Sequence, residues 1–320
     1  MHVIAGAYPA LPKGPLAGEA AADFWRTILD HPTVDGLEIP YLQGLHGDDE
    51  TWFLDQLRGG VHVITAVPVN AMRARNEPGY GLASANEEGR RAALGVAADV
   101  CAAVHRVVDA GAQVAAVALH SAPNRSADPA AGTAAALGQS LIEIGQWDWA
   151  GATLTIEHCD AAVADHPAEK GFLTLTDELQ AITDSGLPVG VVINWARSVI
   201  EGRTTRTAVD HARQARSVGR LTGVMFSGVA ATGDAAWADG HLPPAPGHPE
   251  TLLGGTEIAE TLAAAGTDLA FFGAKVVARP SDETWQDRAA GVLAAVDAVR
   301  AGWEQAAGGE QTDGGEQPGR

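Results

Sequence analysis

Ala152-Thr-Leu-Thr-Ile-Glu157-His158 is a short apolar and β-branched run that ends in a carboxylate and an imidazole. Seven other runs of this kind occur along the chain, and an amphipathic segment follows each of them. They begin at His2, Val34, Val61, Ala112, Pro188, Leu221 and Asp268. Runs that are apolar at nearly every position are typical of strands buried on both faces, as in a parallel sheet. Eight strand–helix alternations in 320 residues predict an α/β fold, a single (β/α)8 barrel of the TIM type.

The spacing of apolar residues also predicts where the helices lie. We expect them at about residues 17–31, 50–58, 84–110, 129–147, 175–185, 205–219, 254–265 and 283–304. The connections 69–83 and 228–250 are long enough to form lids over the barrel. Residues 306–320 are acidic and lack apolar anchors. The sequence therefore predicts one barrel domain over residues 1–305 and a disordered acidic tail from 306 to 320.

Charge and composition exclude several kinds of partner. A formal net charge of −19 argues against binding to nucleic acid or to an anionic membrane surface. The first strand begins at His2, so we expect neither a secretion signal nor a membrane span. The two cysteines, Cys101 and Cys159, are too few for a disulfide framework. We therefore expect a cytoplasmic protein that acts on a small molecule, and the sequence leaves open whether it forms a homo-oligomer.

Polar side chains stand at the ends of the predicted strands. They are Glu38, His120, Glu157, Asn194, Ser227 and Lys275. Barrel enzymes carry their chemistry at the C-terminal ends of the strands, so these residues are the candidate site. Lys275 is one of only three lysines and lies in an otherwise apolar strand. We expect its ammonium group to point inward and to pair with Glu157, because an unpaired buried charge is costly.

Several motifs carry a resemblance to a known superfamily. They are Gly36-Leu-Glu38-Ile-Pro, Leu119-His120, Thr155-Ile-Glu157-His158, and Asp239-Gly-His241-Leu-Pro-Pro with the Gly-rich stretch from Leu253. With these motifs the chain resembles the xylose isomerase-like TIM barrels, which include sugar isomerases and epimerases, inosose dehydratases and metal-dependent apurinic endonucleases. Within that superfamily it is most similar to an uncharacterised bacterial branch. The resemblance implies a carbohydrate substrate and an isomerase or epimerase activity.

The chain departs from the metal-binding pattern of the superfamily at four strand ends. The metal-dependent members take an Asp from strand six with a His three residues later, a His from strand seven and a Glu from strand eight. The corresponding positions here hold Asn194, Arg197, Ser227 and Lys275. Such a set lacks the anionic oxygen ligands that a divalent cation needs and adds positive charge. The departure predicts no metal cofactor, although a different ligand set (His120, Glu157, Asp239 and His241) stays open.

Our leading hypothesis is a metal-independent sugar isomerase or epimerase that moves a proton α to a carbonyl. In it Glu157 is the general base, Lys275 and Arg197 stabilise the enolate or bind an anionic group, and His120 relays the second proton. The expected substrate-binding residues are Glu38, Asn194, Trp195, Arg197, Ser227, Asp239 and His241, with the Trp195 ring stacked on the sugar. This cation content fits a substrate with a carboxylate, phosphate or sulfonate group. Two alternatives are a Schiff-base lyase or aldolase with Lys275 as nucleophile, and a non-catalytic ligand-binding barrel.

Overall fold

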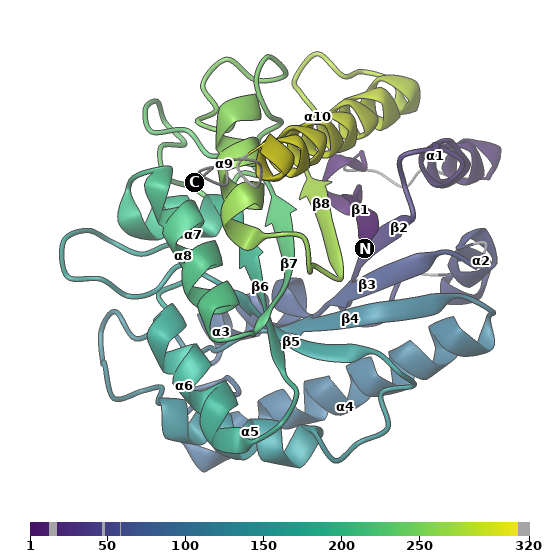
Figure 1. Ribbon diagram of the computed structural model, residues 1–320. Helices are drawn as coiled ribbons and strands as arrows, with labels where there is room; N and C mark the ends of the chain where they lie inside the picture. The colour runs from purple at the N-terminus through teal and green to yellow at the C-terminus, as the bar shows by residue number, and fades with distance from the viewer. Residues whose placement is uncertain (13–17, 47–48, 58, 313–320) are drawn as a thin grey trace, which may run out of the picture.

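The strands form one closed barrel, as the sequence predicts. The computed structural model describes residues 1–12, 18–46, 49–57 and 59–312. All neighbouring strands pair in parallel, and β8 closes on β1 (Figure 1). The strands are β1 (His2–Gly6), β2 (Gly36–Pro40), β3 (Val61–Thr65), β4 (Gln113–Leu119), β5 (Thr153–His158), β6 (Gly190–Asn194), β7 (Leu221–Phe226) and β8 (Phe271–Lys275). The fold is a (β/α)8 TIM barrel.

Helices surround the barrel. They are α1 (Glu19–Leu29), α2 (Glu50–Gln56), α3 (Val67–Asn76), α4 (Glu87–Asp109), α5 (Ala134–Ile144), α6 (Leu175–Ser185), α7 (Trp195–Gly202), α8 (Arg206–Ser217), α9 (Gly255–Ala265) and α10 (Trp285–Thr312), with a short 3₁₀ helix at Tyr8–Ala10. Of the ten α-helices among the described residues, eight overlap the predicted segments, whereas α3 and α7 were not expected. Within the described part of the chain, no helix is both long and apolar enough to cross a membrane.

The two unexpected helices begin directly after their strands. Helix α3 occupies most of the segment that we expected to be a lid, because Pro68 is suited to the first helical turn and the residues after it favour helix. Helix α7 begins after Asn194, whose side chain accepts a hydrogen bond from the Arg197 amide and caps the helix. Only the shorter segment 77–86 is left between α3 and α4. The prediction of one long loop over 69–83 is therefore wrong for residues 69–76, which are helical.

An apolar layer fills the barrel below the strand ends. Its buried members come from six strands: Ile4, Val63, Ala116, Val192, Met225 and Phe271. Burying each of the larger side chains contributes roughly 1.5–3 kcal/mol. Gly223 leaves room for the ring of Phe271, since a Cβ at that position would lie 2.6 Å from the ring. This layer closes the interior from below, so a ligand can approach only from the C-terminal ends of the strands.

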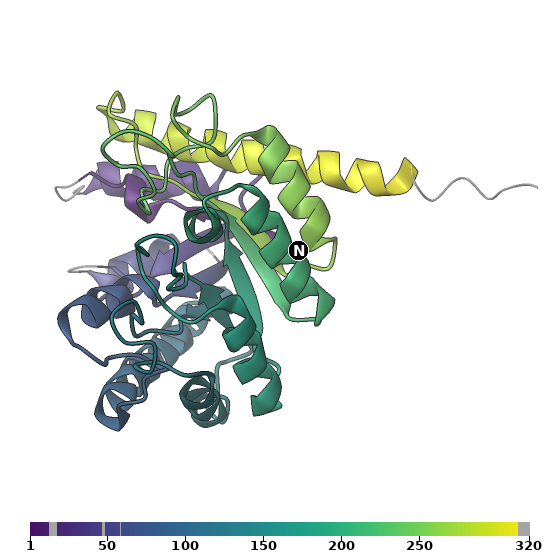
Figure 2. The same ribbon diagram turned by 90° about the vertical axis from the view of Figure 1, so that its left-hand side faces the viewer.

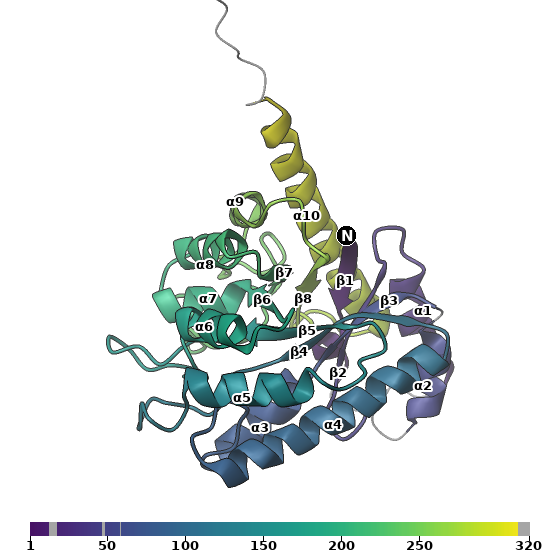
Figure 3. The ribbon, with the colours of Figure 1, turned by 60° about the horizontal axis from the view of Figure 1, so that its bottom comes forward.

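The last helix extends further than the sequence suggested. Helix α10 continues through residue 312, past residue 306, where we predicted the tail to begin. The ring of Trp303 stacks on Phe272 of β8 with a centroid separation of 5.2 Å. A helix anchored in this way can propagate by one hydrogen bond per added residue even through polar sequence. In Figures 2 and 3 α10 projects beyond the other helices. The remainder of the predicted tail, 313–320, lies outside the described residues.

Candidate active site

A ring of polar side chains lies above the apolar layer. Glu38, Thr65, Glu157, Asn194 and Lys275 come from five different strands, and all are at least 97% buried. Side chains alternate between the two faces of a strand, so Thr65 and Asn194 share the inward direction of Val63 and Val192 in the apolar layer, and Lys275 shares that of Phe271. Four of the residues predicted from the strand ends are therefore brought together in one buried cluster.

Lys275 lies at the centre of this cluster. Its Nζ is 3.1 Å from Glu38 Oε1 and 3.5 Å from Glu157 Oε1, and the side chain has no exposed surface. Gly6 on the neighbouring strand leaves space for it, since a Cβ there would lie 2.7 Å from Lys275 Cβ. Burial alone would lower the pKa of Lys275, but Glu157 and Glu38 outweigh burial and raise it above its usual value. Lys275 is therefore an ammonium ion shared by two carboxylates.

Glu157 is held as a carboxylate by several donors. Arg197 NH1 lies 2.6 Å from Glu157 Oε1, and Asn194 Nδ2 donates to the same oxygen at 3.1 Å. Burial opposes ionisation of Glu157, yet Lys275, Arg197 and Asn194 lower its pKa to about 2. A carboxylate with so low a pKa is a weak base. This argues against the role of general base that the sequence suggested for Glu157.

Glu38 has the opposite electrostatic balance. Burial raises its pKa, and the nearby Lys275 offsets this only in part. Its second oxygen, Oε2, is buried and has no hydrogen-bond partner among the described residues. Pairs of titratable groups whose environments push their pKa values apart are typical of acid–base sites. Glu38, predicted only to bind substrate, is therefore better placed than Glu157 to exchange a proton.

Arg197 extends the cluster to the loop after β7. Its Nε lies 3.1 Å from Asp239 Oδ2, and the same carboxylate oxygen is 3.1 Å from Lys170 Nζ. His241 Nδ1 lies 3.3 Å from Asp239 Oδ1, and burial lowers the pKa of this imidazole to about 4. Lys170 was not predicted; its only sequence signal was the scarcity of lysine. The chain of alternating charges runs from Glu38 through Lys275, Glu157, Arg197 and Asp239 to Lys170.

His120 is a neutral, buried imidazole. Its Nδ1 accepts a hydrogen bond from the Ala122 amide at 3.2 Å, so the proton resides on Nε2. That Nε2 is buried without a hydrogen-bond partner in the described part of the chain. Burial, with Arg197 nearby, lowers the pKa of His120 to about 3. His120 is thus suited to donate a hydrogen bond to a ligand rather than to relay a proton as an imidazolium ion.

Two other predicted residues have different surroundings. Ser227 Oγ donates to Asn194 Oδ1 at 3.2 Å, which orients the amide group that contacts Glu157. Trp195 is fully buried and belongs to the apolar cluster between the barrel and its helices. Its ring is enclosed by core side chains, and the expectation that it stacks on a sugar is wrong for this structure. The residue after a strand end points to the helix layer when the strand passes directly into a helix.

The metal centre of the superfamily does not fit these residues. Glu157, the one ligand that is retained, already accepts hydrogen bonds from Arg197 and Asn194. The Arg197 guanidinium lies between Glu157 and Asp239, so a cation stands where the alternative ligand set would have to converge. Within the described residues, His120, Glu157, Asp239 and His241 do not form a cluster of ligand atoms. Fixed positive charges at this place would repel a divalent ion.

A cavity opens between the 3₁₀ helix, α1, the end of β2, α2 and α3. It has a volume of about 560 Å³ and is lined mainly by apolar and aromatic side chains, among them Tyr8, Trp25, Leu45, Phe53 and Met72. Burial raises the pKa of the Tyr8 hydroxyl, and the charges of Lys275, Glu38 and Glu157 also act on it. Tyr8 therefore connects the cavity to the charged cluster. An apolar pocket with a few convergent polar groups is the usual form of a small-molecule site.

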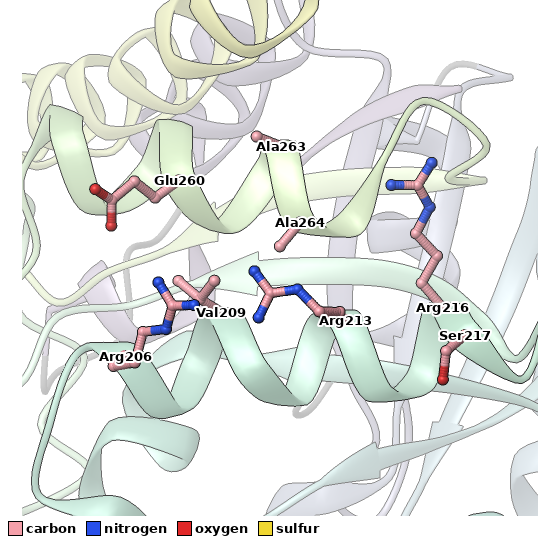
Figure 4. A pocket seen from close by; sticks show the side chains of 8 residues that line it. All are labelled: Arg206, Val209, Arg213, Arg216, Ser217, Glu260, Ala263 and Ala264. Atoms are coloured by element: carbon pink, nitrogen blue, oxygen red, sulfur yellow. The ribbon is translucent and has the colours of Figure 1, made fainter. Parts of the chain in front are cut away.

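A second hollow, of about 640 Å³, lies outside the barrel between α8 and α9 (Figure 4). Arg206, Arg213 and Arg216 extend from α8 toward α9, which contributes Glu260. Two of these arginines are paired with Asp210 on their own helix. The hollow lies in the outer helix layer, away from the C-terminal ends of the strands, so we do not assign the chemistry to it.

Comparisons with known proteins agree with this architecture. The model of one family, described as "Domain of unknown function (DUF4862)", matches residues 4–290. The "Uncharacterized protein STM3670" of Salmonella typhimurium is 37% identical over 273 residues, which are 84% of this chain and 87% of that protein. Among solved structures, a "xylose isomerase-like TIM barrel/4-hydroxyphenylpyruvate dioxygenase fusion protein" matches the whole chain with a TM-score of 0.60 at 13% identity; this chain spans 45% of its length. A D-psicose 3-epimerase from Clostridium cellulolyticum H10 matches 84% of the chain and 99% of its own, with a TM-score of 0.50 at 13% identity. The structural neighbours are thus xylose isomerase-like barrels and include a sugar epimerase.

Proposed function

We propose that this chain, which belongs to the DUF4862 family, is a metal-independent isomerase or epimerase. It would transfer a proton at the carbon next to the carbonyl of a carbohydrate. The observation that carries the proposal is the Lys275 ammonium group between two buried carboxylates of unlike pKa. The architecture shared with a sugar epimerase is consistent with it, although an identity of 13% bears on the fold alone.

In the proposed reaction Glu38 takes the proton from the carbon next to the carbonyl and, as the acid so formed, returns a proton to the enolate to give the product. The pKa of Glu38 is raised, so this carboxylate is the stronger base of the pair. Lys275 stabilises the negative charge that develops on the carbonyl oxygen, which is the task a metal performs in other enzymes. The Nε2 proton of His120 is available for a further hydrogen bond to the substrate. Glu157 and Arg197 hold the ammonium group and the loop in place.

The same electrostatics argue against the Schiff-base alternative. A nucleophilic lysine must be neutral for part of the time, and this usually follows from desolvation or a neighbouring cation. Here two carboxylates raise the pKa of Lys275. We therefore expect no adduct on Lys275 when borohydride is added with a carbonyl substrate. An irreversible adduct would favour the lyase or aldolase.

The cavity suggests how the substrate is held. Tyr8 lies at the boundary between the charged cluster and the apolar wall formed by residues such as Trp25 and Phe53. A sugar has polar hydroxyl groups and apolar C–H faces, and aromatic rings pack against those faces. The three acidic and three basic side chains of the cluster offset one another. A neutral keto-sugar or aldose therefore suits the site better than the anionic substrate considered from the sequence.

The proposal can be tested before the product is known. Purified protein is incubated with a panel of ketoses, aldoses and sugar acids in D₂O, and NMR measures the loss of the C–H signal next to the carbonyl. We expect exchange with at least one sugar, insensitive to a chelator and reduced about 10²–10⁴-fold in Glu38→Gln. Glu143→Gln, an exposed glutamate on α5, is the matched control.

Three results would count against the proposal. Exchange that is lost on addition of EDTA and restored by a metal would mean that the cations do not replace the metal. Full activity in Glu38→Gln would remove the proposed base. A sugar that raises the thermal stability of the protein but exchanges no proton would favour the non-catalytic ligand-binding barrel.

A further inference from the structure

A second buried cluster of ionisable groups lies outside the barrel wall, between β5, α6, α7 and α8. His158 follows Glu157 and points outward, away from the candidate active site. Its Nε2 lies 3.1 Å from Glu201 Oε2, and Glu201 Oε1 lies 3.5 Å from His211 Nε2. The two imidazoles and this carboxylate have ligand atoms within 4.8 Å of one another. The proposed function uses none of these groups.

The separations within this cluster are close to those of a metal site. Two ligands of a tetrahedral Zn²⁺ ion, each about 2.0–2.1 Å from the metal, are themselves about 3.3 Å apart. The two imidazole nitrogens lie 3.1 and 3.5 Å from different oxygens of Glu201. One ligand atom from each of the three residues lies within 4.8 Å of the others, so small shifts of these side chains bring them to the spacing of a common ion. The side chains of Glu201 and His211 are 13% and 12% exposed, so an ion can reach the cluster from solvent.

Groups around the cluster orient both imidazoles. His158 Nδ1 lies 2.8 Å from Glu178 Oε2, and Glu178 is fully buried and hydrogen-bonded in turn to Ser121. His211 Nδ1 lies 3.0 Å from Ser198 Oγ. A histidine ligand almost always gives its other ring nitrogen to such a partner, most often a carboxylate or a backbone carbonyl. In both rings it is therefore Nε2 that faces the shared position beside Glu201.

The charges also favour a divalent cation. Glu178 and Glu201 bring two negative charges to a largely buried place. Without a metal, His158 is an imidazolium ion, because Glu178 and Glu201 outweigh burial and raise its pKa to about 10, and the cluster then carries −1. One divalent ion bound by neutral imidazoles makes it neutral, and buried charge is tolerated when it is paired or coordinates a metal.

We propose that His158, Glu201 and His211 bind one divalent transition-metal ion, such as Zn²⁺, on the outer wall of the barrel. Two imidazoles and one carboxylate leave a fourth position for water. The ion would join the end of β5 to α7 and α8. The site is separate from the proton-transfer chemistry, so it stands or falls independently of the proposed function.

The test is metal binding by the full chain. The protein is stripped with a chelator, dialysed, and titrated with Co²⁺ while the visible absorption of the bound ion is recorded; Zn²⁺ then displaces it in competition. Metal content after dialysis is measured by elemental analysis. We expect one equivalent in the wild type, a 10–100-fold weaker affinity in Glu178→Gln, and no bound equivalent in His211→Ala.

Two control variants locate the metal. His105→Ala removes a histidine whose Nε2 lies 2.9 Å from the carbonyl of Asp148, far along the chain from the cluster, and it should leave binding unchanged. Glu157→Gln should do the same, which separates this site from the barrel interior. Circular dichroism establishes that His211→Ala is folded, and His211→Gln replaces it if it is not. The proposal is refuted if the wild type binds no equivalent, or if folded position-211 variants and Glu178→Gln bind as tightly as the wild type.

Discussion

Replacing Lys275 by Met tests the electrostatics of the barrel interior most directly. Met has a similar length and fills the space beside Gly6, but it cannot donate a hydrogen bond or carry charge. The change leaves Glu38 without its ionic partner, whereas Glu157 keeps Arg197. Removing one member of a buried ion pair typically costs about 3–5 kcal/mol of folding free energy, because the other charge remains buried. For a chain of 320 residues this corresponds to a fall in Tm of roughly 4–7 °C.

The cost should depend on pH. Without Lys275, burial raises the pKa of Glu38 further above its unfolded value. A carboxyl group with a raised folded pKa keeps its full contribution to stability at a pH below its unfolded pKa and loses it as the pH rises through its folded pKa. Lys275→Met should therefore be much less destabilising at pH 5 than at pH 8. Glu38→Gln added to Lys275→Met should restore much of the stability at pH 8, because the uncompensated charge is gone.

The assay is urea-induced unfolding, followed by tryptophan fluorescence at both pH values for the wild type, both single variants and the double variant. The double-mutant cycle isolates the energy of the Lys275–Glu38 pair from the packing effect of Met. A loss below about 1 kcal/mol at pH 8 would contradict the geometry that we describe, since it is the value expected of an exposed pair. An equal loss at both pH values would show that Glu38 does not titrate as we reason.

Three further predictions concern packing, helix length and acid stability. Gly6→Ala should destabilise the protein by about 1–3 kcal/mol in urea unfolding, because the added methyl group meets Lys275. Gly95→Ala is the control: it lies in α4 with no atom near the new methyl group and should stabilise the protein by roughly 0.4–1 kcal/mol. Equal effects of the two substitutions would contradict this reasoning. Trp303→Ala should lower the free energy of unfolding by about 3 kcal/mol and should speed amide hydrogen exchange first in the last turns of α10. Unchanged exchange there would mean that the stack of Trp303 on Phe272 does not anchor the helix. The low pKa of Glu157, about 2, contributes stability that is fully present above pH 4.5 and is lost as the pH falls toward 2. The urea midpoint should therefore fall over that range, and a flat profile would rule out this shift.

The barrel was predictable from sequence because its strands are buried on both faces. Because both faces of a strand such as β6 are buried, its sequence is apolar at nearly every position. The polar residue that ends it then faces either the barrel interior or the helix layer. Strand alternation then put Glu157 and Lys275 on the inner side. The short helices were less visible: α3 begins at Val67-Pro68 and α7 begins directly after Asn194, without the usual connection. A loop usually follows each strand of such a barrel, so we did not predict helices at these two places.

The roles of individual residues were harder to predict, because they depend on burial and on partners distant in sequence. Nothing in the sequence near Lys170 indicates that it pairs with Asp239 across 69 positions. The base that we propose is Glu38 instead of Glu157 because Arg197 contacts Glu157, and strand order alone does not determine that contact. The wrong expectation for Trp195 arose because a residue next to a strand end can belong to the core instead of the site.

The near balance of charge around Lys275 has a consequence for how a substrate arrives. Fields that steer ligands over long distances require an excess of one sign, and here each cation faces a carboxylate at close range. The rest of the chain is strongly acidic, with a net charge of −19, so an anion would be slowed on approach and an uncharged molecule would not. The association rate of a neutral sugar should therefore vary little with ionic strength, and the encounter should be governed by diffusion and by the shape of the cavity mouth.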